Sequence, residues 1–393
     1  MIDVVDQVSI RARLEQRASV FRRWRWLAAL IVLASAPGVQ PASIRAQSAG
    51  AGDRGGQRQQ DDRSADGALL ERTHREEGEA ILAIADAAMA GKQTPVDFTL
   101  TWHNDFIKAQ RGTFVPFTLS VDTSRLSRAA ALVYVRATKR LALERRRSVE
   151  AHETYPVDAI FPVVLNDGSS TGPSRISRGF SIEPGDYDVF VVMRERVEPG
   201  VSRPRPRASV LRQTLAVPDF GSTDLTTSSL MVADRLTPLA EAVPTDLLAE
   251  RPYAIGLNEI TPASDRRFRR DEELIVVFLV YNPTVTTERQ FDLKVEYHFF
   301  RHSGRGPKGD DGAGPRNPGG RPGETYFNRT EPQRFNPALM GPSFDPRSGE
   351  PVLAGQAVPL AGFEDGDYRL DVQITDLLSG KSISRDVMFT VGS

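Results

Sequence analysis

Glu183-Pro184-Gly185-Asp186-Tyr187 and Glu364-Asp365-Gly366-Asp367-Tyr368 are two copies of one short pattern. In each copy an acidic residue lies four positions before the tyrosine, and a glycine lies two positions before it. This spacing is typical of a tyrosine corner, in which the glycine makes a tight turn and the phenol bonds to backbone a few residues upstream. Because such a corner precedes the penultimate strand of a β-sandwich, Gly185 with Tyr187 and Gly366 with Tyr368 predict two sandwiches in tandem.

The segments around both corners have the periodicity of strands. Leu293, Val295 and Tyr297 alternate with charged or polar residues, whereas Glu273 to Tyr281 is almost continuously apolar, as in a central strand. We therefore predict an all-β fold with two immunoglobulin- or fibronectin-like sandwiches over residues 95–217 and 251–393; a single larger barrel is the alternative. The spacing predicts about seven strands in each domain. They start near Val96, Phe114, Ala131, Pro156, Arg175, Tyr187 and Ser209, and near Tyr253, Leu274, Phe291, Thr325, Ala357, Tyr368 and Ile383.

Two further segments interrupt this pattern. Residues 218–250 mix turn residues with the apolar patches Leu230-Met231-Val232 and Leu247-Leu248, which indicates a semi-ordered connector between the domains. Residues 302–323 are dense in Gly, Pro, Arg and Asp and cannot build a core. We expect a flexible surface insert there, which either contacts a partner or has no role.

The N-terminal segment is typical of an export signal. Arg22, Arg23 and Arg25 precede the apolar run Leu27 to Ala34, which is too short to span a bilayer well. We predict a signal peptide over residues 1–46, with cleavage before Gln47 and export to the periplasm, the cell surface or the medium. An uncleaved membrane anchor is the alternative. No later stretch is apolar enough to span a membrane.

A tether and one helix follow the signal. Residues 47–65 are Gly, Gln, Asp and Arg with almost nothing to bury, which predicts disorder. A helix over 66–91 fits Asp66 as its N-cap and Gly91 at its C-terminal end. Its apolar face either packs on the first sandwich or docks a partner.

Composition excludes several classes of function. The chain has no cysteine, which removes thiol nucleophiles, thiolate metal sites and disulfides together. Lys and Arg number 50 against 51 Asp and Glu, so no global field attracts nucleic acid. We expect no cofactor and no nucleic-acid partner.

Candidate catalytic patterns are weak. Gly168-Ser169-Ser170-Thr171-Gly172 matches the literal nucleophile elbow G-x-S-x-G, but Pro173 follows where a helix should begin. His298 and His302 lie four apart on a predicted strand, not on a helical face that could hold zinc. Trp102 is expected in the core rather than in a sugar-stacking surface. The sequence therefore favours a protein that is not an enzyme.

One basic cluster is a candidate surface contact. Arg203, Arg205 and Arg207 alternate with prolines just before the last strand of the first domain. A solvated turn explains them, and an anionic envelope polymer or lipid surface is the alternative.

Five stretches of the C-terminal half carry a resemblance to a known family. They are Arg251-Pro252-Tyr253, Glu273 to Tyr281, Tyr326-Phe327-Asn328-Arg329-Thr330, Gly366-Asp367-Tyr368-Arg369-Leu370 and Leu378-Ser379-Gly380-Lys381-Ser382. In these stretches the chain resembles a family of uncharacterised exported acidobacterial proteins, some of which carry a von Willebrand factor A-like domain upstream. The resemblance implies export and a β C-terminal domain, and brings no activity or site residues. No D-x-S-x-S metal-adhesion motif is present, so ion-dependent adhesion is not implied.

These observations favour a non-enzymatic exported envelope or secreted protein that presents strand edges and loops to a protein partner. A carbohydrate- or polymer-binding module is the first alternative, and exposed aromatic residues gathered on one sheet face would favour it. A hydrolase whose site is not visible in linear motifs is the second, and a pocket gathering His, Asp and Ser would favour it.

Overall fold

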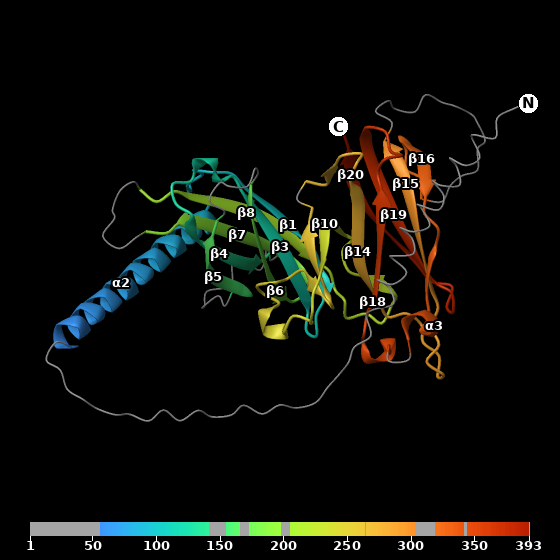
Figure 1. Ribbon diagram of the computed structural model, residues 1–393, viewed down its shortest axis with the longest axis horizontal. Coiled ribbons are helices and arrows are strands. Elements are labelled where there is room, and N and C mark those ends of the chain that lie inside the picture. The colour runs from blue at the N-terminus through green and yellow to red at the C-terminus, as the bar shows by residue number, and fades with distance from the viewer. Residues whose placement is uncertain are drawn as a thin grey trace, which may run out of the picture. The chain divides into compact units, whose positions relative to one another are not determined.

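The structure is a computed structural model that describes residues 56–140, 155–165, 173–197, 205–263, 265–302, 319–341 and 344–392, with the side chains of the N-terminal helix described from Arg72 onward. The described chain forms two compact units, which are coloured blue to green and yellow to red in Figure 1. The first domain extends to Gly221 and includes Leu248–Pro252; the second contains Ser222–Leu247 and the chain from Tyr253 onward.

The first domain is a sandwich of two antiparallel sheets. In one sheet β3 is central, with β1 and β2 along one side and β6 along the other. The other sheet has the order β5-β4-β7-β8. The strands are β1 (Leu100–Asn104), β2 (Ile107–Lys108), β3 (Thr113–Val121), β4 (Ala130–Lys139), β5 (Val157–Val164), β6 (Ser174–Ile182), β7 (Gly185–Glu195) and β8 (Ala208–Val217), with a short 3₁₀ turn, η1, at Thr123–Arg125.

The second domain repeats this arrangement of strands in its two sheets. In one sheet β14 is central, with β9 and β10 along one side and β18 along the other; a β11–β12 hairpin extends it beyond β10. In the other sheet, β16 and β17 pair one after the other with the same side of β15. On the other side of β15 the order continues with β19, β20 and the short parallel strand β13. The elements are β9 (Thr226–Thr227), β10 (Met231–Pro238), η3 (Thr245–Leu247), β11 (Ala254–Ile255), β12 (Asn258–Pro262), β13 (Arg267–Phe268), β14 (Glu273–Tyr281), β15 (Leu293–His302), β16 (Glu324–Arg329), β17 (Gln333–Phe335), α3 (Pro337–Met340), η4 (Pro346–Ser348), β18 (Val352–Pro359), β19 (Gly366–Asp376) and β20 (Ser382–Val391).

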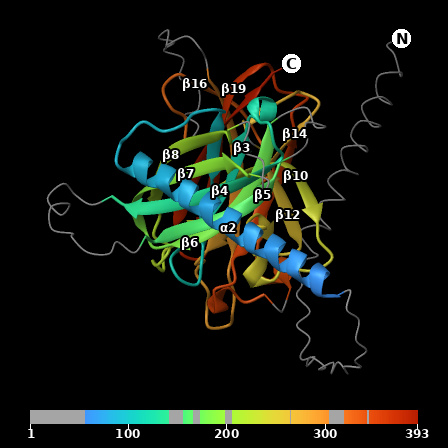
Figure 2. The same ribbon diagram turned by 90° about the vertical axis from the view of Figure 1, so that its left-hand side faces the viewer.

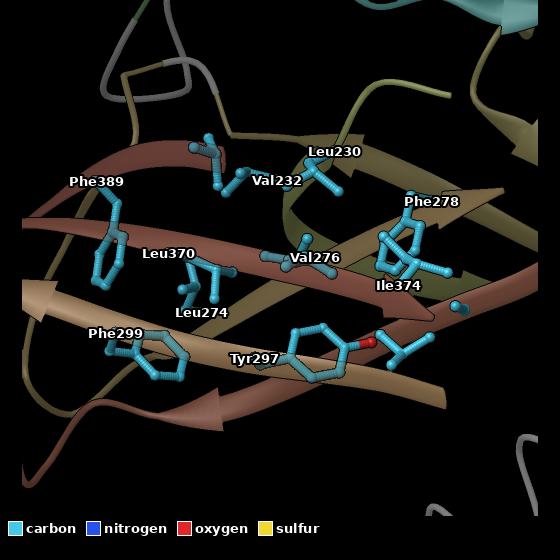
Figure 3. Packing of buried hydrophobic residues seen from close by; sticks show 14 of the residues in the cluster. Leu230, Val232, Leu274, Val276, Phe278, Tyr297, Phe299, Leu370, Ile374 and Phe389 are labelled. Atoms are coloured by element: carbon cyan, nitrogen blue, oxygen red, sulfur yellow. The ribbon is translucent and has the colours of Figure 1, made fainter. Parts of the chain in front are cut away.

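Each domain has its own apolar core between its sheets. In the second domain, Tyr297, Phe299 and Leu370 from one sheet face Val276 and Phe278 from the other (Figure 3). The Tyr297 ring is fully buried, and its hydroxyl donates to Gln333 Oε1 at 2.9 Å, so burial leaves no polar atom of this side chain unpaired. In the first domain Trp102 stacks on Phe117 at 4.2 Å between ring centroids, which places the tryptophan against the core as predicted.

Both predicted tyrosine corners have the expected hydrogen bond. Tyr187 Oη donates to the Glu183 carbonyl at 2.9 Å, and Tyr368 Oη donates to the Glu364 carbonyl at 2.8 Å. Gly185 and Gly366 have φ values of 140° and 152°, in a region that side-chain-bearing residues rarely adopt. The repeated pattern therefore marks equivalent turns, each at the start of the penultimate strand.

Helix α2 (Gly56–Met89) packs on the first domain, as one of the two sequence interpretations expects. Ile81 and Ala85 are fully buried against Tyr134 and Val192 on the outer face of the β5-β4-β7-β8 sheet, which α2 crosses in Figure 2. The buried Glu77 carboxylate accepts from the guanidinium of Arg196 and adds a polar tie.

The predicted start of this helix is wrong. The helix begins at Gly56 rather than Asp66, so 56–65, assigned to a disordered tether over 47–65, are helical. Gln, Arg and Asp there have little to bury, but Gln and Arg are good helix formers, and a docked helix can propagate through them. The predicted end, at Gly91, lies two residues beyond Met89.

The predicted connector over 218–250 is also wrong in its central part. Met231, Val232 and Ala233 pair with β14, and Thr226 and Thr227 pair with the end of the same strand. The first two strands of the second domain, β9 and β10, therefore lie inside the predicted connector. The predicted first strand near Tyr253 is the β11–β12 hairpin at the edge of the sheet. Because β9 and β10 pair with β14 only over short, separate stretches, they have no run of alternating residues long enough to be recognised in the sequence.

Candidate interaction site at the edges of the last strands

The outer strands of the sheets determine where another chain could pair. In an antiparallel ladder, alternate residues bond to the neighbouring strand, and the residues between them direct N–H and C=O away from it. One recorded backbone bond therefore fixes which residues of an edge strand are turned outward.

The last strand of the second domain, β20, has a long open edge. Asp376 N donates to the Lys381 carbonyl at 2.9 Å, so the odd-numbered residues of β20 face β19 and the even-numbered ones face outward. Strand β13 covers only the end of this edge, where Thr390 N donates to the Arg266 carbonyl. In the described part of the chain, no acceptor is recorded for the outward N–H groups of Ser382, Ser384, Asp386 and Met388.

The last strand of the first domain, β8, has a similar but shorter open edge. Glu195 N donates to the Arg207 carbonyl, so the even-numbered residues of β8 face outward. The chain before β1 covers the start of the edge, because Val210 N donates to the Pro95 carbonyl. Arg212, Thr214 and Ala216 follow, and within the described residues their N–H groups have no recorded acceptor.

The edge of β5 is blunted. Leu165 N donates to the Ala129 carbonyl, so the even-numbered residues of β5 face outward, including Pro162, which has no N–H. A proline in the middle of an edge is a common protection against unwanted pairing. The exposed side chains of Ile160 and Val164 therefore lie on a strand that is poorly suited to receive another one.

The edges formed by β16 with β17, by β18 and by β6 are interrupted or already bonded. Residues 330–332 interrupt the edge formed by β16 and β17, and the pairing of β16 with β15 has a register shift at Phe299 and Phe300. Gln333 Nε2 on β17 donates to the Gly355 carbonyl at 2.8 Å, and this bond connects β17 to the outer strand β18 of the other sheet. On β6, Gly179 N donates to the Ala249 carbonyl at 2.9 Å. β20 therefore offers an uninterrupted run of four outward residues, and β8 a run of three.

A covering segment, residues 319–323, lies on the outer face of the sheet beside β20. The Arg369 guanidinium donates to the Gly319 carbonyl at 2.6 Å and bonds to both carboxylate oxygens of Glu324, at 2.7 and 2.6 Å. Arg321 crosses to Asp386 on β20 with two bonds, at 2.7 and 3.2 Å. The covering segment is therefore held to the sheet at several points.

Arg369 and Glu324 form a buried ion pair, with side chains that are each 1% exposed. The Arg369 guanidinium also lies 4.5 Å from the centre of the Phe300 ring. Its hydrogen bonds hold the pKa of Glu324 below the usual range. The sequence gives no sign of this pair, because Arg369 occupies an outward position of an alternating strand, and such a position normally faces water.

The predicted basic contact is only partly described. Arg203 lies outside the described residues, whereas Arg205 and Arg207 are exposed just before β8. The backbone N–H of Arg207 donates to Glu195, which is fully buried and also accepts from Ser127. Burial acts to raise the pKa of Glu195, but these donors outweigh it and hold the pKa low. The Arg207 backbone therefore joins the residue before β8 to Glu195 at the end of β7.

The candidates for catalysis are dispersed. His298 is buried on the outer face of β15, and the exposed His302 has its Nδ1 3.8 Å from Glu324 Oε1. His103 Nε2 lies 3.4 Å from Asp105 Oδ2 on the first domain. Among the described residues, no group of three or more His, Asp and Glu side chains is arranged to hold a metal ion. The segment 168–172 lies outside the described residues.

Two surface properties bear on the alternative functions. In the described ranges, the exposed large apolar side chains are aliphatic, so a stacking platform for sugars is not formed by them. None of the described helices combines the length and the apolar character needed to cross a membrane.

No protein-family model matches the chain, and no curated protein matches it. Among solved structures the chain is similar to a mutant of Salmonella alpha-2-macroglobulin, with 13% sequence identity and a TM-score of 0.19. The match covers 77% of this chain but only 17% of that one. A TM-score of this size supports no argument about function.

Proposed function

We propose that this protein is an exported, non-enzymatic interaction module of the cell envelope or the medium, which binds an extended segment of a protein partner along β20. The observation that carries the proposal is the open β20 edge, with outward backbone groups at Ser382, Ser384, Asp386 and Met388. The basic and apolar segments at residues 22–34 support export.

Backbone pairing supplies the affinity in this kind of binding. A strand that pairs antiparallel to β20 exchanges N–H···O bonds with each outward residue, and each bond contributes about 0.5–1.5 kcal/mol net. One bond must first be displaced, because Arg385 Nη1 donates to the Ser384 carbonyl at 2.9 Å. The Arg321–Asp386 pair holds the Asp386 carboxylate against the covering segment rather than leaving it unpaired at the edge.

The alternatives have less support. Carbohydrate binding would require exposed aromatic rings, and the exposed large apolar side chains of the described surface are aliphatic. A hydrolase would require His, Asp and Ser side chains gathered in one pocket, whereas His103 and His298 lie on different domains. A polysaccharide nevertheless stays the second candidate ligand, and the experiment below distinguishes it.

The test is capture from native envelope extract with residues 47–393 as bait, using two variants of one residue. Ser384→Pro removes an outward N–H, and Ser384→Ala keeps it while losing the same hydroxyl bond to Asp371. We expect the proline variant to bind its partner at least tenfold more weakly, because one bond is lost and a carbonyl of the partner is left unpaired. The alanine variant should bind like the unchanged chain.

A saturable protein partner that is lost with Ser384→Pro and retained with Ser384→Ala supports the proposal. Equal capture by both variants contradicts pairing at β20. Recovery of glycan alone would move the assignment to polysaccharide binding.

A further inference from the structure

The open half of β8 has a different property from β20, because its sequence is complementary to itself. We propose that two copies of this chain pair antiparallel through β8, around a two-fold axis at Thr214. The four-stranded sheet β5-β4-β7-β8 of each copy would join into one continuous sheet. This inference does not depend on binding of a partner at β20.

The register follows from the groups that are already used. Val210 N is bonded to the Pro95 carbonyl, and Pro218 has no N–H, so only Arg212, Thr214 and Ala216 are available for pairing. An axis at Thr214 places Thr214 opposite its own copy and Arg212 opposite Ala216, which uses all three outward residues. An axis at Arg212 would oppose two arginines, and one at Ala216 would oppose Thr214 to Pro218.

The side chains suit this register. Directly opposed threonines form a favourable cross-strand pair, and Ala216 is small enough to lie opposite the arginine. The Arg212 guanidinium stays paired with Asp188, with its Nη2 3.2 Å from Asp188 Oδ2. The two Arg212 residues would lie about 14 Å apart along the strands, beyond the screening length of about 8 Å at physiological salt. The exposed Gln213 amide, which donates to the Thr214 carbonyl at 3.1 Å, would have to turn away.

The β20 edge does not have this self-complementarity. A two-fold pairing that uses all four outward residues of β20 would place its axis at Arg385 and oppose that exposed arginine to its own copy. Like charges placed directly opposite each other destabilise a pair of strands. The two edges therefore differ in the partner they suit: β8 a second copy of the chain, and β20 a segment of another protein.

Engineered cysteines test the register directly, because the chain has no cysteine of its own. In residues 47–393, Thr214→Cys would place two cysteines opposite each other at a Cα separation of about 5.5 Å, within the range of a disulfide. Ala216→Cys is the matched control on the same edge, with its two copies about 14 Å apart in this register. We expect a disulfide-linked dimer from oxidised Thr214→Cys and a mainly monomeric band from Ala216→Cys.

The mass of the unlinked protein provides the second measurement. By light scattering across a range of concentrations, the unchanged chain and Thr214→Ala should reach twice the chain mass. Thr214→Pro should stay monomeric, with far-ultraviolet circular dichroism showing that it is folded. A monomer at every concentration, equal cross-linking of Thr214→Cys and Ala216→Cys, or a dimer that persists in folded Thr214→Pro would each overturn the proposal.

Discussion

The buried Arg369–Glu324 pair gives the sharpest prediction about stability. Replacing Arg369 with Met leaves the Glu324 carboxylate buried without its partner and removes the donor to the Gly319 carbonyl. Breaking a buried ion pair by removal of one partner costs about 3–5 kcal/mol. We expect Arg369→Met to lower the free energy of unfolding of the second domain by about 3 kcal/mol, at the low end because the covering segment can lift and let water in.

Two variants control this measurement. Arg270→Met breaks an exposed pair with Asp365, in which both side chains are 52% exposed, and should cost less than about 1 kcal/mol. Adding Glu324→Gln to Arg369→Met removes the unpaired charge, so the double variant should be more stable than Arg369→Met alone.

The assay separates the domains. In residues 47–393, Trp102 is the only tryptophan, and it packs against the core of the first domain. Urea unfolding followed by tryptophan fluorescence therefore reports the first domain, and circular dichroism reports both. For Arg369→Met we expect the second-domain transition seen by circular dichroism to move to lower urea concentration, and the midpoint of the fluorescence transition to stay unchanged. A loss below about 1 kcal/mol, or an equal shift in both signals, would show that the pair is not a stabilising contact buried in the second domain.

The same pair gives a pH dependence. Arg369 holds the pKa of Glu324 below its value in the unfolded chain, so the pair contributes stability above the unfolded pKa. That contribution is lost as the pH falls through the folded pKa. The difference in stability between the unchanged chain and Arg369→Met should therefore shrink on acidification below about pH 4; a difference that stays constant or grows would contradict the assignment.

Three further changes test the domain architecture. Gly366→Ala forces a side chain into positive φ and should cost the second domain about 1–3 kcal/mol, whereas alanine at Gly380, at a hairpin turn with a φ of 72°, should cost less than at Gly366; urea unfolding compares the two. Tyr187→Phe removes the bond to the Glu183 carbonyl and should cost about 1 kcal/mol, visible in the Trp102 transition and absent if the corner were unimportant. Ile81→Ala should weaken docking of α2 by about 2–4 kcal/mol, so limited proteolysis should cut the helix before the sandwich; unchanged protection would argue against this packing.

The architecture of both domains could be predicted from local patterns. The glycine and tyrosine of each corner have one backbone requirement and one hydrogen bond, and both are set by residues within five positions of each other. The long strands β14 and β19 are evident from their apolar periodicity. Strands β9 and β10 could not be recognised in the sequence, because their pairing with β14 is short and interrupted.

The candidate interaction sites could not be predicted from the sequence. Whether Ser384 or Arg385 turns its N–H outward depends on which pairs of the β19–β20 ladder are hydrogen-bonded, and no local pattern fixes that parity. The Arg369–Glu324 pair depends on the fold-back of residues 319–323, which brings together groups 45 positions apart. Composition indicated that residues 302–323 do not belong to the core, but the predicted flexible insert is wrong at both ends. His302 ends β15, and 319–323 are held to the sheet by bonds of Arg369 and Arg321; residues 303–318 lie outside the described residues.

Residue-resolved amide hydrogen exchange along β20 measures whether the outer edge of this strand is open. In residues 47–393, without a partner, the amides of Ile383, Arg385, Val387 and Phe389 should exchange slowly, because they face β19. Those of Ser382, Ser384, Asp386 and Met388 should exchange rapidly, because they face solvent, and should become protected when a partner strand binds. Alternating protection is the predicted result. Uniform protection along the strand without a partner would mean that the edge is already covered and cannot receive another strand.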